Sequence, residues 1–395
     1  MQRRIHIFIL ALCLVAGCGS NDPSSTTSLR FLDSPPEYPL KCVYQGCSPM
    51  SWQPDDLDEV ARAGMLILPA AWCFSPDAEN VLGDLAGRNP DLRIIGYQLV
   101  LGVSVLDVDT SYLRRTLPFY LDYYNATTDD WAFSTTGDTL MMWPGQIMLN
   151  PISGGAVNRR LIMETVDMME RYRANTTGRH DGVMHDYFMD SPFINPFVRP
   201  MVDGSIDLDG NGILFGEDAL EQALFVEWQK EYAREIRNRF GDDFIQIANG
   251  RLPQDDAELA GLLNGIFYEV FPNMRWNLTD RDGLLALLGH QSEGYLAKAA
   301  GRTWSIVSNE YGGGNNLFCL LASMFAGCFY TELHGTYLFT GWTLEIDGGR
   351  PLGPGSLEGR TDSLMTVQRR FERGVVRMRF NASGARIETV FEPVD

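Results

Sequence analysis

Two aspartates stand at the end of an apolar run in the sequence GVMHDYFMD, residues 182–190. The run predicts a buried strand, and Asp186 and Asp190 follow where that strand should end. A carboxylate at a strand end can serve as a general acid, a general base or a nucleophile. The structural alternative is that Asp186 accepts loop N–H groups and that Asp190 opens an Asp-Ser-Pro turn.

Polar residues also stand at the ends of three later apolar runs. If these runs are parallel strands of one barrel, their ends lie on the same side and the polar side chains converge. Carboxylates, amides and aromatic rings that converge in this way suit a site that binds sugar hydroxyls and cleaves a glycosidic bond with a pair of acids. The residues are Asn249 and Arg251 for the run 244–250, Tyr268 and Glu269 in the run 265–271, and Glu310 for the run 303–310.

Asp186 and Glu269 are two of the carboxylates that could form such a pair. Structural alternatives remain open, because Glu269 can pair with Arg251 or Arg275 and Trp72 can pack in the core. Glu310 is also a rival for the role of catalytic acid. We expect substrate contacts from six residues, which are Trp72, Asp190, Asn249, Arg251, Tyr268 and Glu310.

The apolar runs alternate with helical patterns along most of the chain. Eight strands alternating with helices over this length predict a (β/α)8 TIM barrel, which we place at 41–346. An open doubly wound sheet is the alternative, but the Gly-rich turn typical of that fold is missing. The expected strands are 64–72, 93–103, 146–151, 180–188, 244–250, 265–271, 303–310 and 336–342.

A different pattern begins after Asp347. A Gly-rich segment is followed by alternating charged and apolar residues, which predicts a loop and a β-hairpin over 347–395. The barrel should therefore carry a small C-terminal β appendage.

The N-terminal residues resemble a bacterial lipoprotein signal. A basic start and a short apolar run fill residues 1–17, and the four residues before Cys18 fit a lipobox, whose cysteine is lipidated. Gly19 rather than Asp follows this cysteine, which favours the outer membrane. Residues 18–40 are rich in Ser, Thr, Asn, Asp and Pro, as in a flexible tether. We expect attachment to the membrane through the lipid alone, and an ordinary secretory signal is the alternative.

The charge balance argues against one class of partner. The chain has 32 Lys and Arg against 51 Asp and Glu, a formal net charge of -19, with no basic cluster. Binding to phosphate backbones needs clustered basic residues. We therefore expect a polysaccharide substrate and no nucleic acid.

A second acidic motif lies in DLDGNGILFGED, residues 207–218. Asp207, Asp209 and Asn211 occupy alternate positions between glycines, and Asp218 stands at the twelfth place, as in an EF-hand loop. These four residues are predicted ligands of a structural calcium ion. A hydrated Asp-Gly turn is the alternative, and we expect no cofactor for catalysis.

Two other functional classes compete with a glycosidase. His180, Asp181, His185, Asp186 and Asp190 lie close together in the sequence and suggest a metal-dependent hydrolase. Adjacent residues of a strand point to opposite faces, however, so His185 and Asp186 should not bind one ion together. A noncatalytic glycan-binding lipoprotein is the other alternative, and turnover measurements separate it from an enzyme.

Four segments carry a resemblance to a known group of families, and they are DGVMHD at 181–186, IANG at 247–250, FYEVF at 267–271 and RRFERGVV at 369–376. In their order and spacing they resemble hypothetical glycosyl hydrolase family 15, which is related to the endo-α-1,4-polygalactosaminidases of glycoside hydrolase family 114. The resemblance implies a TIM barrel with Asp186 and Glu269 as the catalytic pair. His185 departs from the apolar or aromatic residue found in many relatives, which leaves the substrate open.

Overall fold

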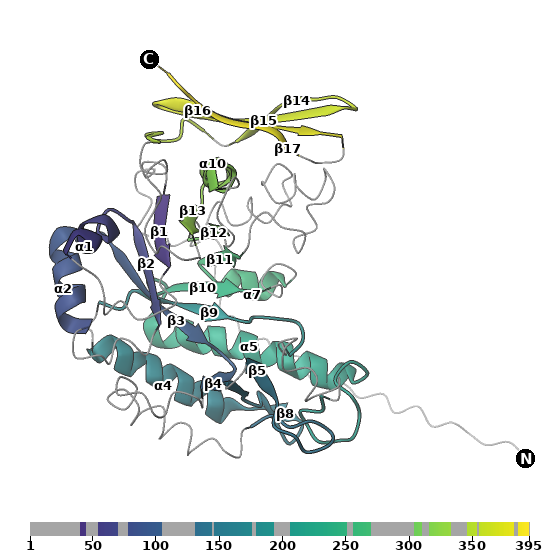
Figure 1. Ribbon diagram of the computed structural model, residues 1–395. Coiled ribbons are helices and arrows are strands. Elements are labelled where there is room, and N and C mark those ends of the chain that lie inside the picture. The colour runs from purple at the N-terminus through teal and green to yellow at the C-terminus, as the bar shows by residue number, and fades with distance from the viewer. Residues whose placement is uncertain are drawn as a thin grey trace, which may run out of the picture.

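The computed structural model describes residues 40–44, 54–69, 78–104, 131–143, 146–175, 179–192, 206–250, 256–269, 304–309, 316–332, 346–353, 355–382 and 386–394. Figure 1 shows a barrel of strands with helices around it and a separate β-sheet on the outer side of one helix, α10 (Asn316–Ala326). The predicted signal peptide, Cys18 and nearly all of the predicted tether lie outside the described residues.

Eight parallel strands close into one barrel, in the order β1-β13-β12-β11-β10-β9-β3-β2. Strand β9 is buried along its whole length. Burial on both faces is expected where helices cover a parallel sheet outside and side chains fill it inside. The predicted (β/α)8 barrel is confirmed. Its strands are β1 (Leu40–Tyr44), β2 (Met65–Pro69), β3 (Arg93–Leu99), β9 (Gly182–Asp186), β10 (Ile245–Asn249), β11 (Gly265–Tyr268), β12 (Ile306–Asn309) and β13 (Phe329–Glu332).

Helices pack on the outside of this barrel (Figure 1). The longest described helix, α5, begins after Asp218, whose side chain accepts the free N–H groups of Leu220 and Glu221. Its buried face includes Trp228 and Tyr232, which cover the outer side of β9 and β10. The described helices are α1 (Pro54–Val60), α2 (Ala78–Arg88), α4 (Arg159–Asn175), α5 (Ala219–Phe240), α7 (Ala257–Leu262) and α10 (Asn316–Ala326).

Two of the expected strand positions need correction. The run 146–151 is not a barrel strand, because β6 (Gln146–Met148) pairs antiparallel with β4 (Gly102–Ser104) and β5 (Met141–Trp143) in a separate sheet. The missing barrel strand is β1, which starts at Leu40, the last residue of the predicted tether. The eighth strand is β13, whereas the run 336–342 lies outside the described residues. An apolar run shows that a strand forms, but it does not show which sheet the strand joins.

The C-terminal appendage is a four-stranded antiparallel sheet rather than a hairpin. The sheet packs on α10, where the rings of Phe318 and Phe380 meet edge to face at 6.2 Å. Arg369 donates to the carbonyls of Met324 and Phe325 at the end of α10, which have no partner within the helix. The strands are β14 (Ser356–Arg360), β15 (Leu364–Phe371), β16 (Gly374–Asn381) and β17 (Arg386–Pro393).

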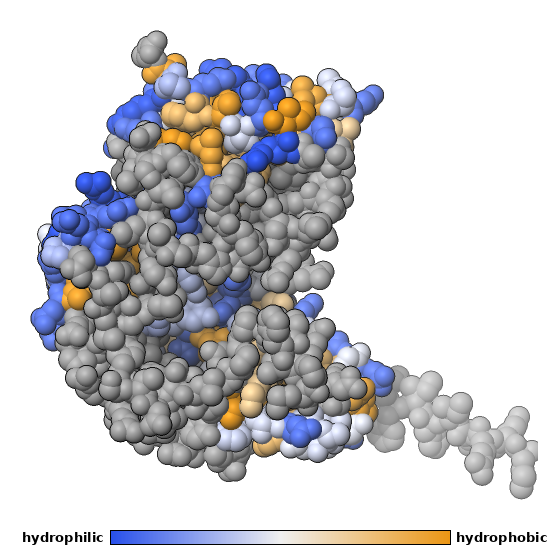
Figure 2. Space-filling model, in the orientation of Figure 1, coloured by the Kyte–Doolittle hydropathy of each residue, from blue (hydrophilic) through white to orange (hydrophobic). Residues whose placement is uncertain are grey.

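The excess of acidic residues shows on the surface. Hydrophilic residues gather over α1 and α2 in Figure 2, and the first turn of α1 carries Asp55 and Asp56. Among the described residues, no helix is long and apolar enough to cross a membrane.

Candidate active site

Three of the predicted site residues lie together at the C-terminal end of the barrel. Asp186 ends β9, Asn249 ends β10 and Glu269 directly follows β11. His185 is in register with Ala248, so Asp186 and Asn249 are the next neighbours across the two strands. Asn249 is in register with Phe267. Glu269 comes two residues after Phe267 and therefore shares its face of the sheet.

Asn249 joins the two carboxylates. Its amide nitrogen donates to Asp186 Oδ1 at 2.9 Å and to Glu269 Oε2 at 2.9 Å. Two oxygens that each lie 2.9 Å from one nitrogen are separated by at most twice that distance, about 5.8 Å. The barrel thus holds two acids close to each other with one neutral donor between them.

Asp186 accepts two further hydrogen bonds. The Tyr97 hydroxyl donates to Oδ2 at 2.5 Å, and the Tyr187 backbone N–H donates to Oδ1 at 3.0 Å. The Asp186 side chain is buried, with 8% of the residue exposed. Burial and the charge of Glu269 raise the pKa of Asp186 to about 7, against the opposing effect of the hydrogen bonds from Tyr97, Asn249 and Tyr187. Asp186 therefore exchanges its proton near neutral pH rather than in the acidic range usual for an aspartate.

Aromatic rings inside the barrel surround the pair. Tyr44 of β1 meets Tyr97 edge to face at 6.0 Å and Phe267 at 5.7 Å. Burial first, and then the charges of Asp186 and Glu269, raise the pKa of Tyr44 well above its usual value. Burial and Asp186 do the same to the pKa of Tyr97. Both hydroxyls therefore stay protonated, and that of Tyr97 donates to Asp186.

Sequence reasoning missed Tyr44 and Tyr97. Both are tyrosines near the C-terminal end of a strand, which is the signal that could have found them. Tyr97 was part of an expected strand, and Tyr44 belongs to β1, which was not expected. Tyr97 lies beside Asp186 because β3 pairs with β9. Tyr44 meets Phe267 of β11, a strand that does not pair with β1, only inside the closed barrel.

The backbone beyond β9 and β10 is closely packed. Tyr187 has a positive φ of 66°, the only such non-glycine value among the described residues. The Phe188 N–H donates to the Asn249 carbonyl at 2.9 Å. Gly250 has φ 144°, and a Cβ built there would lie 2.0 Å from the Phe188 carbonyl oxygen. A residue held in a rare backbone region, as Tyr187 is, needs support from its surroundings. The hydrogen bond from Phe188 to Asn249 supplies that support beside Asp186.

Two of the other predicted contact residues, Asp190 and Tyr268, are among the described residues. Asp190 is exposed and accepts a hydrogen bond from the Ser191 hydroxyl at 3.3 Å. Tyr268 is fully buried, and strand alternation places it on the face opposite Phe267. Arg251, Glu310 and Trp72 lie outside the described residues.

The histidines near Asp186 belong to the layer beneath the helices. The His185 ring stacks on Phe188 at 4.9 Å and meets Tyr232 of α5 at 5.1 Å. Burial lowers the pKa of His185 to about 3 and that of His180 to about 4. His185 thus points away from Asp186, as strand alternation predicts. This arrangement gives no support to a metal site shared by the two.

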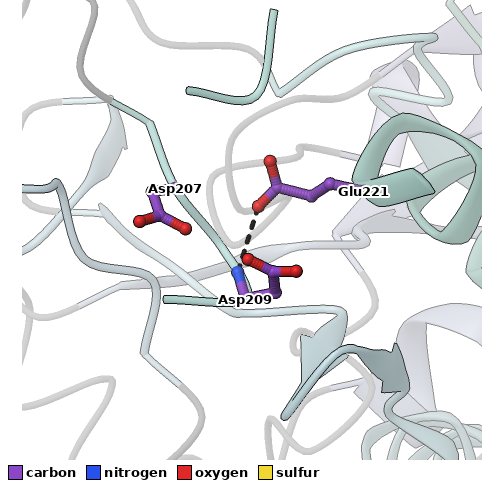
Figure 3. A group of neighbouring side chains, drawn as sticks. All are labelled: Asp207, Asp209 and Glu221. Atoms are coloured by element: carbon purple, nitrogen blue, oxygen red, sulfur yellow. Dashed lines mark hydrogen bonds between the residues drawn. The ribbon is translucent and has the colours of Figure 1, made fainter. Parts of the chain in front are cut away.

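A second group of acids lies in the connection from β9 to α5. Carboxylate oxygens of Asp207, Asp209 and Glu221 lie within 4.8 Å of one another (Figure 3). Glu221, in the first turn of α5, was not among the predicted ligands. Asp218 instead caps α5, and its second oxygen accepts the Asn211 amide at 2.7 Å.

Comparisons with known proteins give only remote likenesses. No protein-family model and no curated protein matches the chain, so the resemblance to hypothetical glycosyl hydrolase family 15 stays a prediction.

Among solved structures, the chain is similar to a cyclic α-maltosyl-(1→6)-maltose hydrolase from Arthrobacter globiformis, with 11% identity over 83% of this chain and 81% of that chain and a TM-score of 0.44. An α-amylase from Lactobacillus plantarum has 9% identity over 82% of each chain and a TM-score of 0.42. A debranching enzyme from Nostoc punctiforme has 12% identity over 83% of this chain and 79% of that chain and a TM-score of 0.41. Likenesses this remote leave the reaction to be argued from the site.

Proposed function

We propose that this protein is a glycoside hydrolase that cleaves a polysaccharide with Asp186 and Glu269. The observation that carries the proposal is the bridge of Asn249 between these two carboxylates at the C-terminal end of a barrel. That end is where TIM-barrel enzymes place their chemistry. A pair of acids, one of them ionised and one protonated, is what hydrolysis of a glycosidic bond needs.

The separation of the acids supports a retaining mechanism. Retaining enzymes hold their carboxyl groups about 5 to 5.5 Å apart, and inverting enzymes hold them about 6.5 to 9.5 Å apart to admit a water. The shared Asn249 donor limits the nearer oxygens of the pair to about 5.8 Å. A covalent intermediate, rather than direct attack by water, therefore suits this site.

The hydrogen bonds of Asp186 support its role as nucleophile. Among the described residues, every group that bonds to its carboxylate is a donor, namely the Tyr97 hydroxyl, the Asn249 amide and the Tyr187 N–H. Donors favour the ionised form of an acid. We therefore propose Asp186 as the ionised nucleophile and Glu269, which is half-buried, as the acid that donates a proton.

The reaction then has two steps. Asp186 attacks the anomeric carbon and forms an ester with the sugar, while Glu269 gives its proton to the departing glycosidic oxygen. Glu269 next takes a proton from water, whose oxygen attacks the anomeric carbon and releases the Asp186 carboxylate. The sugar keeps its anomeric configuration, and one water is consumed.

A depolymerisation screen against bacterial and plant polysaccharides tests this proposal. Asp186→Asn and Glu269→Gln should each lower turnover by orders of magnitude and leave the fold intact. Asp243→Asn is the matched control, because Asp243 is exposed and precedes β10 at the opposite end of the barrel. The anomeric configuration of the first product, followed by NMR, should be that of the substrate.

Each contrary outcome points to a different error. Inversion of configuration would rule out Asp186 as nucleophile. If Glu269→Gln is fully active and Glu310→Gln is inactive, the catalytic acid is Glu310 at the end of the seventh strand. Glycan binding without turnover by any purified preparation would favour the noncatalytic alternative.

A further inference from the structure

Two separate elements bring acids together beside the start of α5. Asp207 and Asp209 lie in the loop before the helix, and Glu221 lies in its first turn. One carboxylate oxygen of each lies within 4.8 Å of the others. In Figure 3 the Glu221 side chain reaches from the helix toward the loop segment that carries both aspartates.

Glu221 is the informative member of this group. It is fully buried, and its Oε1 accepts the backbone N–H groups of Leu208 and Asp209. Its Oε2 is buried too and accepts no hydrogen bond from the residues that the structure describes. A buried carboxylate oxygen without a partner is unfavourable, and two neighbouring acids add repulsion. A cation bound through both Glu221 oxygens, as a bidentate glutamate binds calcium, would relieve both effects.

The donor atoms identify the kind of cation. Carboxylate oxygens without sulfur or imidazole nitrogen suit calcium, magnesium or manganese. Two oxygens that each ligate calcium at about 2.4 Å are at most about 4.8 Å apart, so the observed group can share one ion. Magnesium keeps most of its waters and needs a regular octahedron. Calcium accepts irregular sites built from side chains and backbone carbonyls, so a buried acid such as Glu221 favours calcium.

We propose that Asp207, Asp209 and Glu221 bind a calcium ion that ties the end of the β9–α5 connection to the first turn of α5. Compared with the EF-hand spacing of the sequence, Glu221 takes the place of Asp218. Asp218 caps the same helix and accepts a hydrogen bond from Asn211. The ion and the cap would therefore both stabilise the connection between this loop and α5. That connection starts at Asp186, and calcium therefore supports the loop that follows the catalytic strand. The proposal does not depend on the proposed reaction.

Calorimetric titration of the full chain with calcium chloride, after removal of metals with a chelator, tests the site directly. One ion should bind per chain, and millimolar calcium should raise the melting temperature because the ion binds only the folded state. Glu221→Gln and Asp207→Asn should each weaken calcium binding by about tenfold or more, since affinity follows the charge and number of ligands. Glu217→Gln is the matched control, because Glu217 is an exposed acid in the same loop.

A second measurement covers the case in which a variant folds poorly. Glutamine keeps the shape of Glu221 and an oxygen for the two N–H groups, but it removes the buried charge. In chelator, Glu221→Gln should therefore melt no lower than the wild type, and in calcium it should melt lower. The proposal is overturned if the wild type shows neither heat nor a melting shift, if magnesium binds as tightly as calcium, or if Glu221→Gln and Glu217→Gln respond alike.

Discussion

The Tyr97 hydroxyl donates a hydrogen bond to Asp186 Oδ2 at 2.5 Å, across the neighbouring strands β3 and β9. Asp186 is in register with Leu99, two residues beyond Tyr97, so both side chains face the inside of the barrel. The donor stabilises the ionised form of an acid whose pKa burial raises. Tyr97 is therefore a positioning residue that helps keep Asp186 ionised and oriented as the nucleophile.

Tyr97→Phe should lower kcat and move the acid side of the pH profile to higher pH. A hydrogen bond to a charged group contributes about 1.5 to 3 kcal/mol, which corresponds to a loss of roughly 10- to 100-fold. The direction of the pH shift follows because removal of a donor from a carboxylate raises its pKa. The measurement is kcat/KM against pH, with Tyr172→Phe on α4 as a control for removal of a buried hydroxyl. An unchanged pH profile with a lower kcat would show a merely structural role.

Asp186→Asn should make the protein more stable than the wild type at high pH. The pKa of Asp186 rises from 3.8 to about 7 on folding. A raised carboxyl pKa means that the folded state binds more protons than the unfolded state between these values, so the stability from Asp186 is lost as pH rises through about 7. Asparagine does not ionise. The stability difference between the variant and the wild type should therefore grow as pH rises from about 4 to about 7.

Urea unfolding at several pH values measures this difference. Asp243→Asn is again the control, because Asp243 is exposed and its substitution should leave the pH dependence of the wild type nearly unchanged. A constant difference between Asp186→Asn and the wild type over the whole range would mean that the pKa of Asp186 is not raised in the folded protein.

The sequence predicted the barrel and the strand ends that carry Asp186, Asn249 and Glu269, but not Tyr44 and Tyr97, which lie beside them. Asp186 ends the fourth barrel strand as expected, although only because two errors offset each other, the omission of β1 and the inclusion of the run 146–151. Tyr44 meets Phe267 only when the barrel closes. Glu221 was missed because EF-hand spacing ends at Asp218, whereas the next turn of helix brings Glu221 back toward the loop.

Cys18→Ser should release the protein from membranes. The segment before Cys18 fits a lipobox, and the residues after it have the composition of a flexible tether. One acyl chain binds a membrane only weakly, whereas several chains give stable attachment, so loss of the predicted lipidation site should remove the anchor. Fractionation of cells that express each form measures the outcome. Cys13→Ser, within the predicted signal peptide, is the control and should remain in the membrane fraction. Equal membrane attachment of Cys18→Ser and the wild type would refute the lipid anchor.

Gly250→Ala should destabilise the fold by at least about 2 kcal/mol, because it combines backbone strain with a clash. Gly250 has φ 144°, which side chains rarely adopt, and its new Cβ would lie 2.0 Å from the Phe188 carbonyl oxygen. Asn249 or Phe188 must move to relieve the clash, and Asn249 donates hydrogen bonds to both acids. Activity should therefore fall even under conditions where the variant is fully folded. The matched control is Gly83→Ala in α2, where a Cβ meets nothing within 4 Å and alanine should stabilise the helix by roughly 0.5 to 1 kcal/mol. If the two variants unfold at the same urea concentration, the packing of Gly250 against Phe188 does not hold the site together.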